Sequence, residues 1–426
     1  MKSKLIARRK LLLQSFAGTA LIAASGAVYG ADSKSQTVGM AEPNLTTKAD
    51  VLVIGGGTAG VIAAIQAARA GAKTVLIERG SQLGGTMTVG GVAFPGLFHA
   101  WGKQIISGIG WELVKETVAM DNGKLPDFAT PPSRHWKHQV QINQFLYALL
   151  AEEKCLEAGV KIVYYEFPLS IEQAENGWML ESVGPGTRRK IISKQLIDCT
   201  GGADVVGMLN MPRLREKETQ PGSMLFKSGD AYQPGREQLQ AVYVHGADSS
   251  NSITRTEANL NGRQAILKQL RQTQALGNEP ARLIQMQPEA AFRESYRILG
   301  ETVITHQDYT SGRVFQDAVC YAFYPIDLHT RQGVKPKPLA QGVVPTVPLR
   351  ALTPKNSRNI LVAGRCVSSD RLANSALRVQ ASCMAMGQAA GTAAALAAQL
   401  KTTPLEVPLE DIRRLLHEND AIVPVS

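Results

Sequence analysis

The sequence predicts an α/β fold in which two separated stretches of chain build one domain around a mainly parallel sheet. A short apolar run, a glycine-rich turn, an alanine-rich helical pattern and a second apolar run follow one another within residues 49–80. Another strand pattern and a long helix of small apolar residues come only within residues 348–405, and residues 212–347 are polar and weakly periodic. We therefore expect a Rossmann-like domain from residues 48–211 and 348–405, interrupted by an inserted α+β domain at 212–347.

The first 31 residues have the pattern of an export signal. Five basic residues lie within the first ten positions, no acidic residue precedes Asp32, and a long apolar run follows the basic start. This order, closed by small residues, is typical of a secretory signal peptide. Arg8 and Arg9, in the string RRKLL, resemble the twin-arginine export signal, although Ala7 stands where Ser or Thr is usual. A general secretory signal and an uncleaved membrane anchor are the alternatives.

The net charge depends on whether this segment is retained. The whole chain has 46 Lys and Arg residues against 36 Asp and Glu residues, a formal charge of +10. Removal of residues 1–31 takes away five basic residues and no acid, which leaves 41 against 36, or about +5. No basic stripe or nucleic-acid motif remains, so we expect no nucleic-acid partner. Residues 32–47 are polar and are expected to form a linker, and residues 406–426 a C-terminal tail.

Cysteine usage bears on the compartment and on the cofactors that the chain can hold. The five cysteines form no close pair and no CxxC or CxxCH motif, whereas proteins that fold in an oxidising compartment more often carry paired cysteines. Folding in the reducing cytoplasm, before export to the periplasm or the medium, fits this usage. The pattern excludes attached c-type haem, cysteine-based zinc clusters and a CxxC redox disulfide, and we expect no metal site. The cysteines are Cys155, Cys199, Cys320, Cys366 and Cys383.

The start of the first domain has the strand and glycine spacing of a dinucleotide-binding turn. Residues 51–54 are apolar and mostly β-branched, which suits a buried parallel strand. Gly55, Gly57 and Gly60 follow with GxGxxG spacing. The first glycine permits a tight turn, the second lets the backbone approach a pyrophosphate, and the third lets the helix pack on the sheet.

A helix and a second strand complete this unit. The helical pattern begins at Thr58 and Ala59 and ends before Gly71, and residues 74–77 form a second apolar strand. Glu78, at the end of this strand, lies where a carboxylate accepts hydrogen bonds from an adenosine ribose. Together these features predict a site for an adenine dinucleotide, and both NAD and FAD fit the pattern.

The loop after this acid favours FAD. Arg79 is followed by a second glycine-rich segment that contains Gly84, Gly85 and Thr86. This segment resembles the loop by which flavoproteins pass their backbone close to FAD. The glycines themselves permit only close approach, so a flexible surface loop is the alternative. No second GxGxxG occurs, so we expect no internal NAD(P)H domain.

The elements that follow extend the sheet. Apolar residues spaced i, i+3, i+4 and i+7 over residues 142–150 predict an amphipathic helix that Gly159 ends. A strand is expected at residues 160–165, and a β-meander at residues 172–192 with turns at its Asn-Gly and Gly-Pro-Gly sequences. Another short strand is expected at residues 195–199.

The C-terminal part again shows the pattern of an apolar strand, a glycine turn and an alanine-rich helix. Residues 359–364 form a strand that meets a glycine turn, and residues 376–400 form a helix that is small and apolar on all sides. Such a helix is expected to be deeply buried. Gly387 and Gly391 make a GxxxG on this helix, but arginine and glutamine side chains interrupt it. We therefore expect close helix packing rather than a membrane span or membrane dimerisation.

Four separated segments resemble one family, the FAD-dependent oxidoreductases related to the flavoproteins of fumarate reductase and succinate dehydrogenase. The segments are VLVIGGGTAG with LGGTMTVGG; IDCTGGADVV; FRESYRILGETVITHQDYTSGRVFQDAV with YPIDLH; and NILVAGRCVSSDRLANSALRVQASCMAMGQAAG. The likeness covers residues 48–400 and implies a glutathione-reductase-type FAD domain whose last strand and helix come from the C-terminal end. It also implies FAD contacts from Thr200, Gly201, Gly364, Arg365 and Ala376. Gly202 departs from the acid that the family often has, and Asp204 is the candidate that replaces it.

The resemblance also points to residues for the chemistry, because FAD transfers hydride at N5 while the protein positions the substrate and moves the proton. A helix that begins near residues 376–378 would offset negative charge on the flavin; a structural capping role for Arg378 is the alternative. Asp327 and His329 would share one face of a strand, where the carboxylate would orient the imidazole. A surface pair without function is the alternative for these two residues.

Two arginines are candidates for binding the substrate. Arg293 and Arg297 are four residues apart in FRESYR, which would place them on one helix face and let them clamp a substrate carboxylate. Structural ion pairs with nearby glutamates are the alternative. Tyr324 is a further catalytic candidate, and His99 would either face the flavin or be attached to it.

These observations predict an exported FAD-dependent oxidoreductase that transfers hydride between a small organic substrate and FAD. An external electron carrier or oxygen would complete its cycle, and the export machinery is the other expected partner. A redox-neutral flavoenzyme and an FAD-carrying subunit that docks with a membrane-associated partner subunit for electron transfer are the alternatives.

Overall fold

The structure is a computed structural model, and every described element belongs to one unit of the chain, Glu42–Ser426. The described residues are 45–130, 134–229, 237–275 and 282–424. The export signal predicted for residues 1–31 lies outside the described residues, as does most of the predicted linker.

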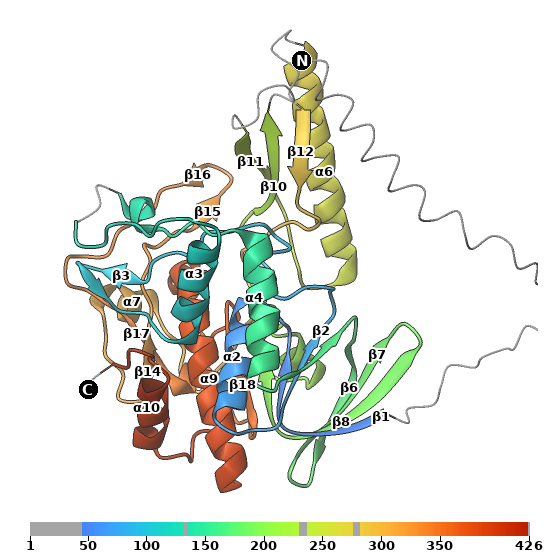
Figure 1. The fold of residues 1–426 in the computed structure, drawn as a ribbon, viewed down its shortest axis with the longest axis vertical. Coiled ribbons are helices and arrows are strands. Elements are labelled where there is room, and N and C mark those ends of the chain that lie inside the picture. Colours follow the sequence, from blue (N-terminus) through green and yellow to red (C-terminus); the bar gives the residue numbers. More distant parts are fainter. Residues whose placement is uncertain (1–44, 131–133, 230–236, 276–281, 425–426) are drawn as a thin grey trace, which may run out of the picture. The chain divides into compact units, whose positions relative to one another are not determined.

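Within the described residues, the largest sheet has seven strands. The strands β5, β2, β1, β8 and β18 run parallel to one another in that order, and β7 and β6 continue from β8 as antiparallel neighbours (Figure 1). This confirms the mixed α/β fold with parallel strands. The strands are β1 (Leu45–Ile54), β2 (Thr74–Glu78), β5 (Lys161–Tyr164), β6 (Phe167–Ala174), β7 (Gly177–Gly184), β8 (Thr187–Asp198) and β18 (Ile360–Val362).

Two strands are longer than the sequence pattern indicates. β1 begins at Leu45, inside the predicted linker, because its first residues pair with Arg189 and the residues after it in β8. The strand predicted at residues 195–199 is the second half of β8, whose first half is the third strand of the meander. Periodicity misses these extensions because backbone pairing with a distant strand, rather than side-chain alternation, sustains them.

Successive residues of the parallel strands face two different cores. Val51 and Val53 pack into the larger core with the helices, and Leu52 and Ile54 pack into the smaller core on the meander side. This follows from the two-residue period of a strand whose faces are both covered. The helices of the larger core include α2 (Thr58–Arg69), α3 (Ile109–Met120), α4 (Gln144–Glu157) and α9 (Gln380–Leu400). The smaller core includes α5 (Asp204–Met208).

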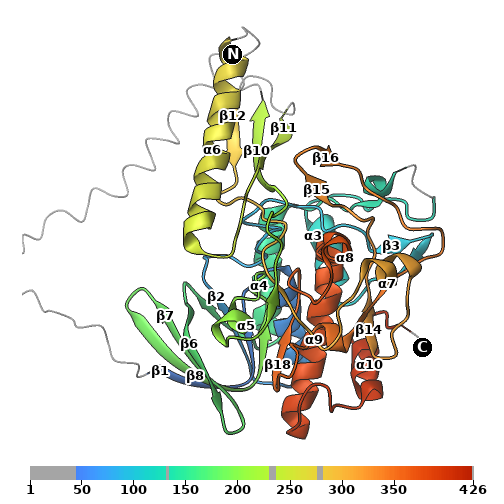
Figure 2. The same ribbon diagram turned by 180° about the vertical axis from the view of Figure 1, so that it is seen from behind.

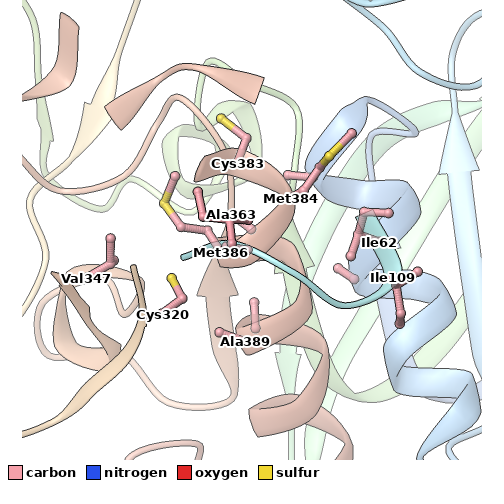
Figure 3. Close-up of a cluster of buried hydrophobic side chains, with 14 of the residues drawn as sticks. Ile62, Ile109, Cys320, Val347, Ala363, Cys383, Met384, Met386 and Ala389 are labelled. Atoms are coloured by element: carbon pink, nitrogen blue, oxygen red, sulfur yellow. The ribbon is translucent and has the colours of Figure 1, made fainter. Parts of the chain in front are cut away.

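Close packing of α2 on α9 joins the two ends of the described chain. A Cβ atom on Gly387 would lie 2.3 Å from the carbonyl oxygen of Ala59, and one on Gly391 would lie 2.4 Å from that of Ala63. The predicted role of these glycines in helix packing is therefore confirmed. Figure 3 shows Ile62 of α2 against one side of α9, with side chains of other segments against its opposite side. No described helix is long and apolar enough to span a membrane.

The C-terminal helix is not continuous, and the prediction of one helix over residues 376–400 is wrong. α8 (Arg371–Leu377) is separate from α9, because Val379 has an extended backbone conformation and is the N-cap of α9. The predicted tail also contains α10 (Leu409–Glu418), whose Ile412 and Leu416 are buried in the larger core. The turn before α9 places Arg378 outside both helices, and this is important for the site.

The helix predicted near residue 142 is present as α4, but its buried face differs from the predicted one. Phe145 and Leu149 are more than half exposed, whereas Tyr147 and Ala148 are buried. Phe145 instead borders the large cavity described below. An apolar stripe therefore located the helix correctly but did not show which side packs on the core.

The segment between the two parts of the main domain contains a three-stranded sheet with one helix on it (Figure 2). This helix, α6, contacts β10 and β11, and its Ala258 and Ile266 share a small core with Met224 and Phe226 of β10. The elements are β10 (Gly222–Gly229), β11 (Gln238–Val244), α6 (Ser252–Ala275) and β12 (Arg282–Met286).

The remaining elements are short and connect these layers. The short elements are β3 (His99–Ala100), β4 (Lys103–Gln104), η1 (His135–His138), β9 (Arg213–Leu214), β13 (Arg297–Ile298), α7 (His306–Ser311), β14 (Ala318–Tyr321), β15 (His329–Thr330), β16 (Gly333–Val334), β17 (Thr346–Pro348) and η2 (Leu349–Ala351).

All five cysteines are free and buried, which agrees with the absence of paired cysteine motifs from the sequence.

Candidate functional site

A cavity of about 1420 Å³ lies at the carboxyl ends of β1, β2, β8 and β18. Ile54, Glu78, Cys199 and Ala363 line it, and each ends or directly follows one of these strands. Ligands of open α/β folds bind at this edge of the sheet. The volume exceeds the roughly 300–1,000 Å³ of sites for one small molecule, so a single small ligand does not fill it.

The geometry of the first turn fits the roles predicted for its three glycines. Gly55 has a φ of +100°, a conformation that a side chain would strain. A Cβ atom on Gly57 would meet nothing within 4 Å and would enter the cavity that this residue lines. A Cβ atom on Gly60 would lie 1.9 Å from the carbonyl oxygen of Gly55. No side chain caps α2, so its first N–H groups can bind an anion such as a pyrophosphate.

Glu78 is held at the rim of the cavity by backbone N–H groups. Its Oε2 accepts a hydrogen bond of 2.7 Å from the Gly56 nitrogen, and its Oε1 accepts one of 2.7 Å from the Gly80 nitrogen. Each carboxylate oxygen has a further lone pair that can accept a ribose hydroxyl. The geometry therefore fits the role in adenosine binding that its position at the end of β2 predicts.

Arg255 and Arg365 lie in the neighbouring wall of the cavity. Among the described residues, Arg365 donates only to neutral acceptors, the oxygens of Gly201, Phe292 and Ser249 at 2.7, 2.8 and 3.2 Å. Burial lowers the pKa of Arg365, and it lowers the pKa of Arg255 to about 10, which leaves Arg255 charged at neutral pH. Buried charges require counter-charges, so this wall favours an anionic ligand such as a dinucleotide phosphate.

Asp204, the candidate that replaces the family's acid, also lines the cavity near these arginines. Burial raises the pKa of its carboxyl group, while Arg79 and Arg255 act to lower it. Arg255 itself forms an ion pair of 3.3 Å with Glu289. Asp204 and Glu289 thus lie beside Arg79 and Arg255, whereas the hydrogen-bond partners of Arg365 among the described residues are all neutral, which keeps Arg365 suited to an anion.

Most residues predicted to contact FAD line this cavity, and three do not. Gly60 and Gly84 instead support the turn: the Gly84 nitrogen donates a hydrogen bond of 2.8 Å to the Gly56 oxygen. Ala376 is fully buried in α8, so its predicted position at a helix start facing the cavity is wrong. The predicted residues that line the cavity are Gly55, Gly57, Thr58, Ala59, Glu78, Arg79, Gly85, Thr86, Thr200, Gly201, Gly364 and Arg365.

The helix that faces the cavity begins four residues later, at Gln380. The amide nitrogen of Gln380 donates a hydrogen bond of 2.7 Å to the oxygen of Val92, and its amide oxygen accepts one of 3.1 Å from the Thr58 hydroxyl. Gln380 thus connects the starts of α2 and α9 across the cavity. Sequence reasoning missed this residue because the helix was expected to start earlier.

The structure brings the predicted acid–imidazole pair together in the cavity. The Nε2 atom of His329 lies 3.0 Å from the Oδ2 atom of Asp327, and both residues line the cavity. Asp327 precedes β15 rather than lying in a strand, so strand alternation is not what aligns the two side chains. Arg378 holds the acid from the other side, with its Nη2 atom 3.1 Å from the Asp327 carbonyl oxygen and 3.4 Å from Oδ2.

Arg293 and Tyr324 complete the group of predicted catalytic residues that share the cavity. Arg293 donates a hydrogen bond of 2.6 Å to the Pro221 oxygen and lies over the ring of Tyr243, with 5.4 Å between its Cζ atom and the ring centroid. The hydroxyl of Tyr324 accepts a hydrogen bond of 2.6 Å from Gln139. Burial raises the pKa of Tyr324 to about 12, so its hydroxyl stays protonated at neutral pH.

The charges of this cluster do not cancel. Burial raises the pKa of Asp327, but the hydrogen bond with His329 and the charge of Arg378 outweigh this, and the pKa lies below its ordinary value. Burial lowers the pKa of His329, and the hydrogen bond to Asp327 offsets this only in part. Burial also lowers the pKa of Arg293 to about 10. At neutral pH two guanidinium groups therefore accompany one carboxylate and a neutral imidazole.

Two predicted positions lie elsewhere. Residues 293–297 do not form a helix, and Arg297 is buried outside the cavity, where it forms an ion pair of 2.9 Å with Glu216. His99 does not line the cavity; it stacks on Phe128 with 3.8 Å between ring centroids. The structure therefore contradicts the predicted helix face shared by Arg293 and Arg297, and it places neither Arg297 nor His99 in this cavity.

Two further residues of the cluster carry no motif in the sequence. The hydroxyl of Tyr243 lies 3.4 Å from the Nδ1 atom of His329, and Gln139 holds Tyr324. Both line the cavity. The alternating pattern of QLQAVYV indicates the strand that presents Tyr243, but only the position of β11 over the cavity reveals its neighbours.

A comparison with models of protein families shows the class of this chain. A family model described as FAD dependent oxidoreductase matches residues 50–231 and 211–416. Similar solved structures include the anhydrotetracycline hydroxylase OxyS from Streptomyces rimosus, 13% identical with a TM-score of 0.45, over 88% of this chain and 66% of that one. A flavoprotein/dehydrogenase from Cytophaga hutchinsonii is 14% identical with a TM-score of 0.44, over 88% and 84%.

A geranylgeranyl bacteriochlorophyll reductase-like protein from Thermoplasma acidophilum is 12% identical with a TM-score of 0.44, over 88% of this chain and 84% of that one. This chain spans slightly less than two thirds of the length of the hydroxylase. No protein with a curated description matches the sequence.

Substitutions of two neighbouring glycines should separate FAD binding from folding. Gly57→Leu has an ordinary backbone φ of −69° and open space at Cβ, so the protein should fold normally while FAD affinity falls at least ~100-fold. Gly60→Ala would place a methyl group against the Gly55 oxygen and should lower the free energy of unfolding of the FAD-free protein by about 1–3 kcal/mol. Flavin absorbance and denaturant unfolding measure the two effects. Full FAD occupancy in Gly57→Leu would contradict the assignment of this turn.

Proposed function

The chain belongs to the FAD-dependent oxidoreductase family, and on that premise we propose that it oxidises or reduces a small substrate bearing a carboxylate or similar anionic group. The observation that carries this proposal is the excess positive charge of the cluster formed by Arg293, Asp327, His329 and Arg378 in the cavity. Such an excess, away from bulk water, favours a ligand with one negative charge.

Arg378 supports this substrate class in a second way. Its Nε atom is buried and has no hydrogen-bond partner among the described residues. An unpaired buried donor costs free energy, which a substrate oxygen would recover. Arg293, whose side chain donates only to the Pro221 oxygen among the described residues, has further N–H groups to offer. The pair that binds the carboxylate in this proposal is therefore Arg293 and Arg378, in place of Arg293 and Arg297.

The hydrogen bonds of His329 define its part in the reaction. Ionised Asp327 accepts from Nε2–H, so the neutral ring keeps its lone pair on Nδ1, the atom nearest the Tyr243 hydroxyl. Bound FAD supplies the acceptor or donor of hydride. In the oxidative direction a substrate carbon loses hydride and the adjacent heteroatom loses a proton, which Nδ1 takes directly or through the Tyr243 hydroxyl. The reductive direction reverses both transfers.

We also propose that the FAD domain is of the glutathione-reductase type and related to the fumarate reductase and succinate dehydrogenase flavoproteins, with residues 48–211 and 348–405 forming it. Two contacts support this proposal: β18 pairs with β8 in the sheet that contains β1, and α9 packs on α2. Residues 212–347 are then the substrate domain. They supply Arg293, Asp327 and His329, together with the β10–β11 face that borders the cavity.

Export remains a proposal that depends on the sequence of residues 1–31. We propose that the enzyme works in the periplasm or medium, after twin-arginine export, and exchanges electrons with an external carrier or oxygen. Replacement of both Arg8 and Arg9 by Lys should abolish export in a bacterial host, while Lys4→Arg should not. Cell fractionation of the FAD-loaded protein measures this, and unchanged export of the double variant would contradict the proposal.

The carboxylate requirement can be measured on bound FAD without oxygen. Small hydroxy and amino acids should bleach oxidised FAD, or their oxidised forms should reoxidise reduced FAD, whereas the corresponding methyl esters should not. Arg293→Met should raise the half-saturating concentration of the acid about 10–100-fold, because charged hydrogen bonds contribute about 1.5–3 kcal/mol. Arg331→Met, an exposed arginine outside the cavity, is the control. Equal reaction of acids and esters would exclude this substrate class.

The pKa of His329 should shift in opposite directions when the charge of Asp327 and the charge of Arg293 are removed. Asp327→Asn removes a charge that raises the pKa of His329, so the pKa should fall further below 6.5. Arg293→Met removes a charge that lowers it, so the pKa should rise. NMR titration of the ring protons measures this without a substrate, and His329→Gln identifies the signal among the seven histidines. Shifts of the same sign would show that these side chains do not control the imidazole.

A further inference from the structure

The helix α6 uses only one of its sides for packing. Its buried residues Ala258, Gly262 and Ile266 face the sheet, where a Cβ atom on Gly262 would lie 3.1 Å from Met224. The other face of this sheet borders the cavity through Leu225 and neighbouring side chains. Figure 2 shows α6 along the outer edge of this sheet, with β10–β12 on its inner side. The outer side of α6 is therefore separated from the cavity by the sheet.

Large apolar residues repeat on this outer side at intervals of seven. Ile253, Leu260 and Leu267 are 70%, 50% and 47% exposed. With 100° per residue they fall within about 40° of one line along the helix, opposite the buried face. Exposed apolar residues scattered singly are normal, but their regular repeat along one side of a helix is typical of a contact surface.

Polar residues on the same line place an acid and a base at equal distances from a central glutamine. Glu257, Gln264 and Arg271 alternate with the three apolar residues, and all three are exposed. Neither Glu257 nor Arg271 has an ion pair or side-chain hydrogen bond within the described residues. The sequence along the line is therefore apolar, acid, apolar, Gln, apolar, base, with its centre near Gln264. We call these six residues the α6 stripe.

We propose that the α6 stripe is the contact by which two copies of this chain form an antiparallel, two-fold symmetric dimer. An axis at Gln264 places Glu257 of each copy opposite Arg271 of the other, and Leu260 of each copy within one residue of Leu267 of the other. Glu257 and Arg271 are 14 positions apart, or about 21 Å along the helix, so both ion pairs and the apolar contacts fit along one helix. A two-fold contact must be self-complementary in this way.

The charges also exclude the parallel arrangement. In parallel register, Glu257 would face Glu257 and Arg271 would face Arg271, and such like-charge pairs are destabilising. The contact lies on the side of the sheet away from the cavity, so a second copy leaves access to substrate unchanged. One helix pair is a small interface, and we expect a dimer that dissociates at low concentration.

The test is a charge exchange on the purified protein with its FAD bound. Analytical ultracentrifugation over a concentration series should show a monomer–dimer equilibrium. Each of Glu257→Arg and Arg271→Glu turns both symmetry-related ion pairs into like-charge pairs, so each should raise the dissociation constant at least ~10-fold. The double variant restores opposite charges in reversed order, and its dissociation constant should return to within about 3-fold of the wild-type value.

Further variants distinguish this surface from others. Leu260→Ser with Leu267→Ser should leave a monomer, whereas Leu149→Ser, which changes an exposed leucine of α4, should leave the dimer unchanged. Flavin content and thermal melting show that each variant is folded. A wild-type monomer at 100 µM (roughly the upper end of the series), a dimer that survives the double serine change, or a double charge exchange without recovery would each overturn the proposal.

Discussion

The close contact between α2 and α9 determines how the rest of the site is assembled. Because Gly387 and Gly391 carry no side chains, the backbone of α9 approaches the carbonyl oxygens of Ala59 and Ala63 directly. Two helices that lie more than 300 residues apart in the sequence therefore begin at the same cavity. The hydrogen bond between Thr58 and Gln380 is the direct result. A larger residue at either glycine would separate the two halves of the cavity wall as well as the helices.

This contact also explains why the cofactor site is divided between distant segments. The first turn supplies an uncapped helix start and a glycine whose Cβ position opens into the cavity. The C-terminal half supplies Arg365, whose partners are neutral oxygens, and thereby adds positive charge to the wall. Neither half makes a site for a dinucleotide phosphate by itself. The helix contact brings the uncapped N–H groups and the arginine to one cavity.

The second half of the cavity depends on electrostatic compensation between three segments. Asp327 supplies the carboxylate of the cluster. His329 and Arg378 form ion pairs with it, and the charge of Arg293 lowers its pKa. Arg378 takes part because the chain turns between α8 and α9 instead of continuing as one helix. The sheet of β10–β12 then separates this chemistry from the outer surface, since one face borders the cavity and α6 packs on the other.

Local sequence determined the elements whose signal is short-range. The strand–glycine–helix–strand unit, Glu78 at its end and the packing glycines of α9 follow from backbone sterics and from periodicity within about 30 residues, and the structure contains all of them. The pair of Asp327 and His329 was also predictable, because only one residue separates its members. Its alignment in a strand was not, since a coil segment carries Asp327.

The tertiary structure alone decided the positions of side chains whose partners lie far away in the sequence. FRESYR has helical spacing, yet Arg293 borders the cavity while Arg297 pairs with Glu216, because both lie in extended chain rather than on one helix face. Tyr243, Gln139 and Gln380 have no motif, and they join the site because distant elements pack there. Sequence pattern reports the conformation of neighbouring residues, whereas these contacts are selected by the packing and charge balance of the whole fold.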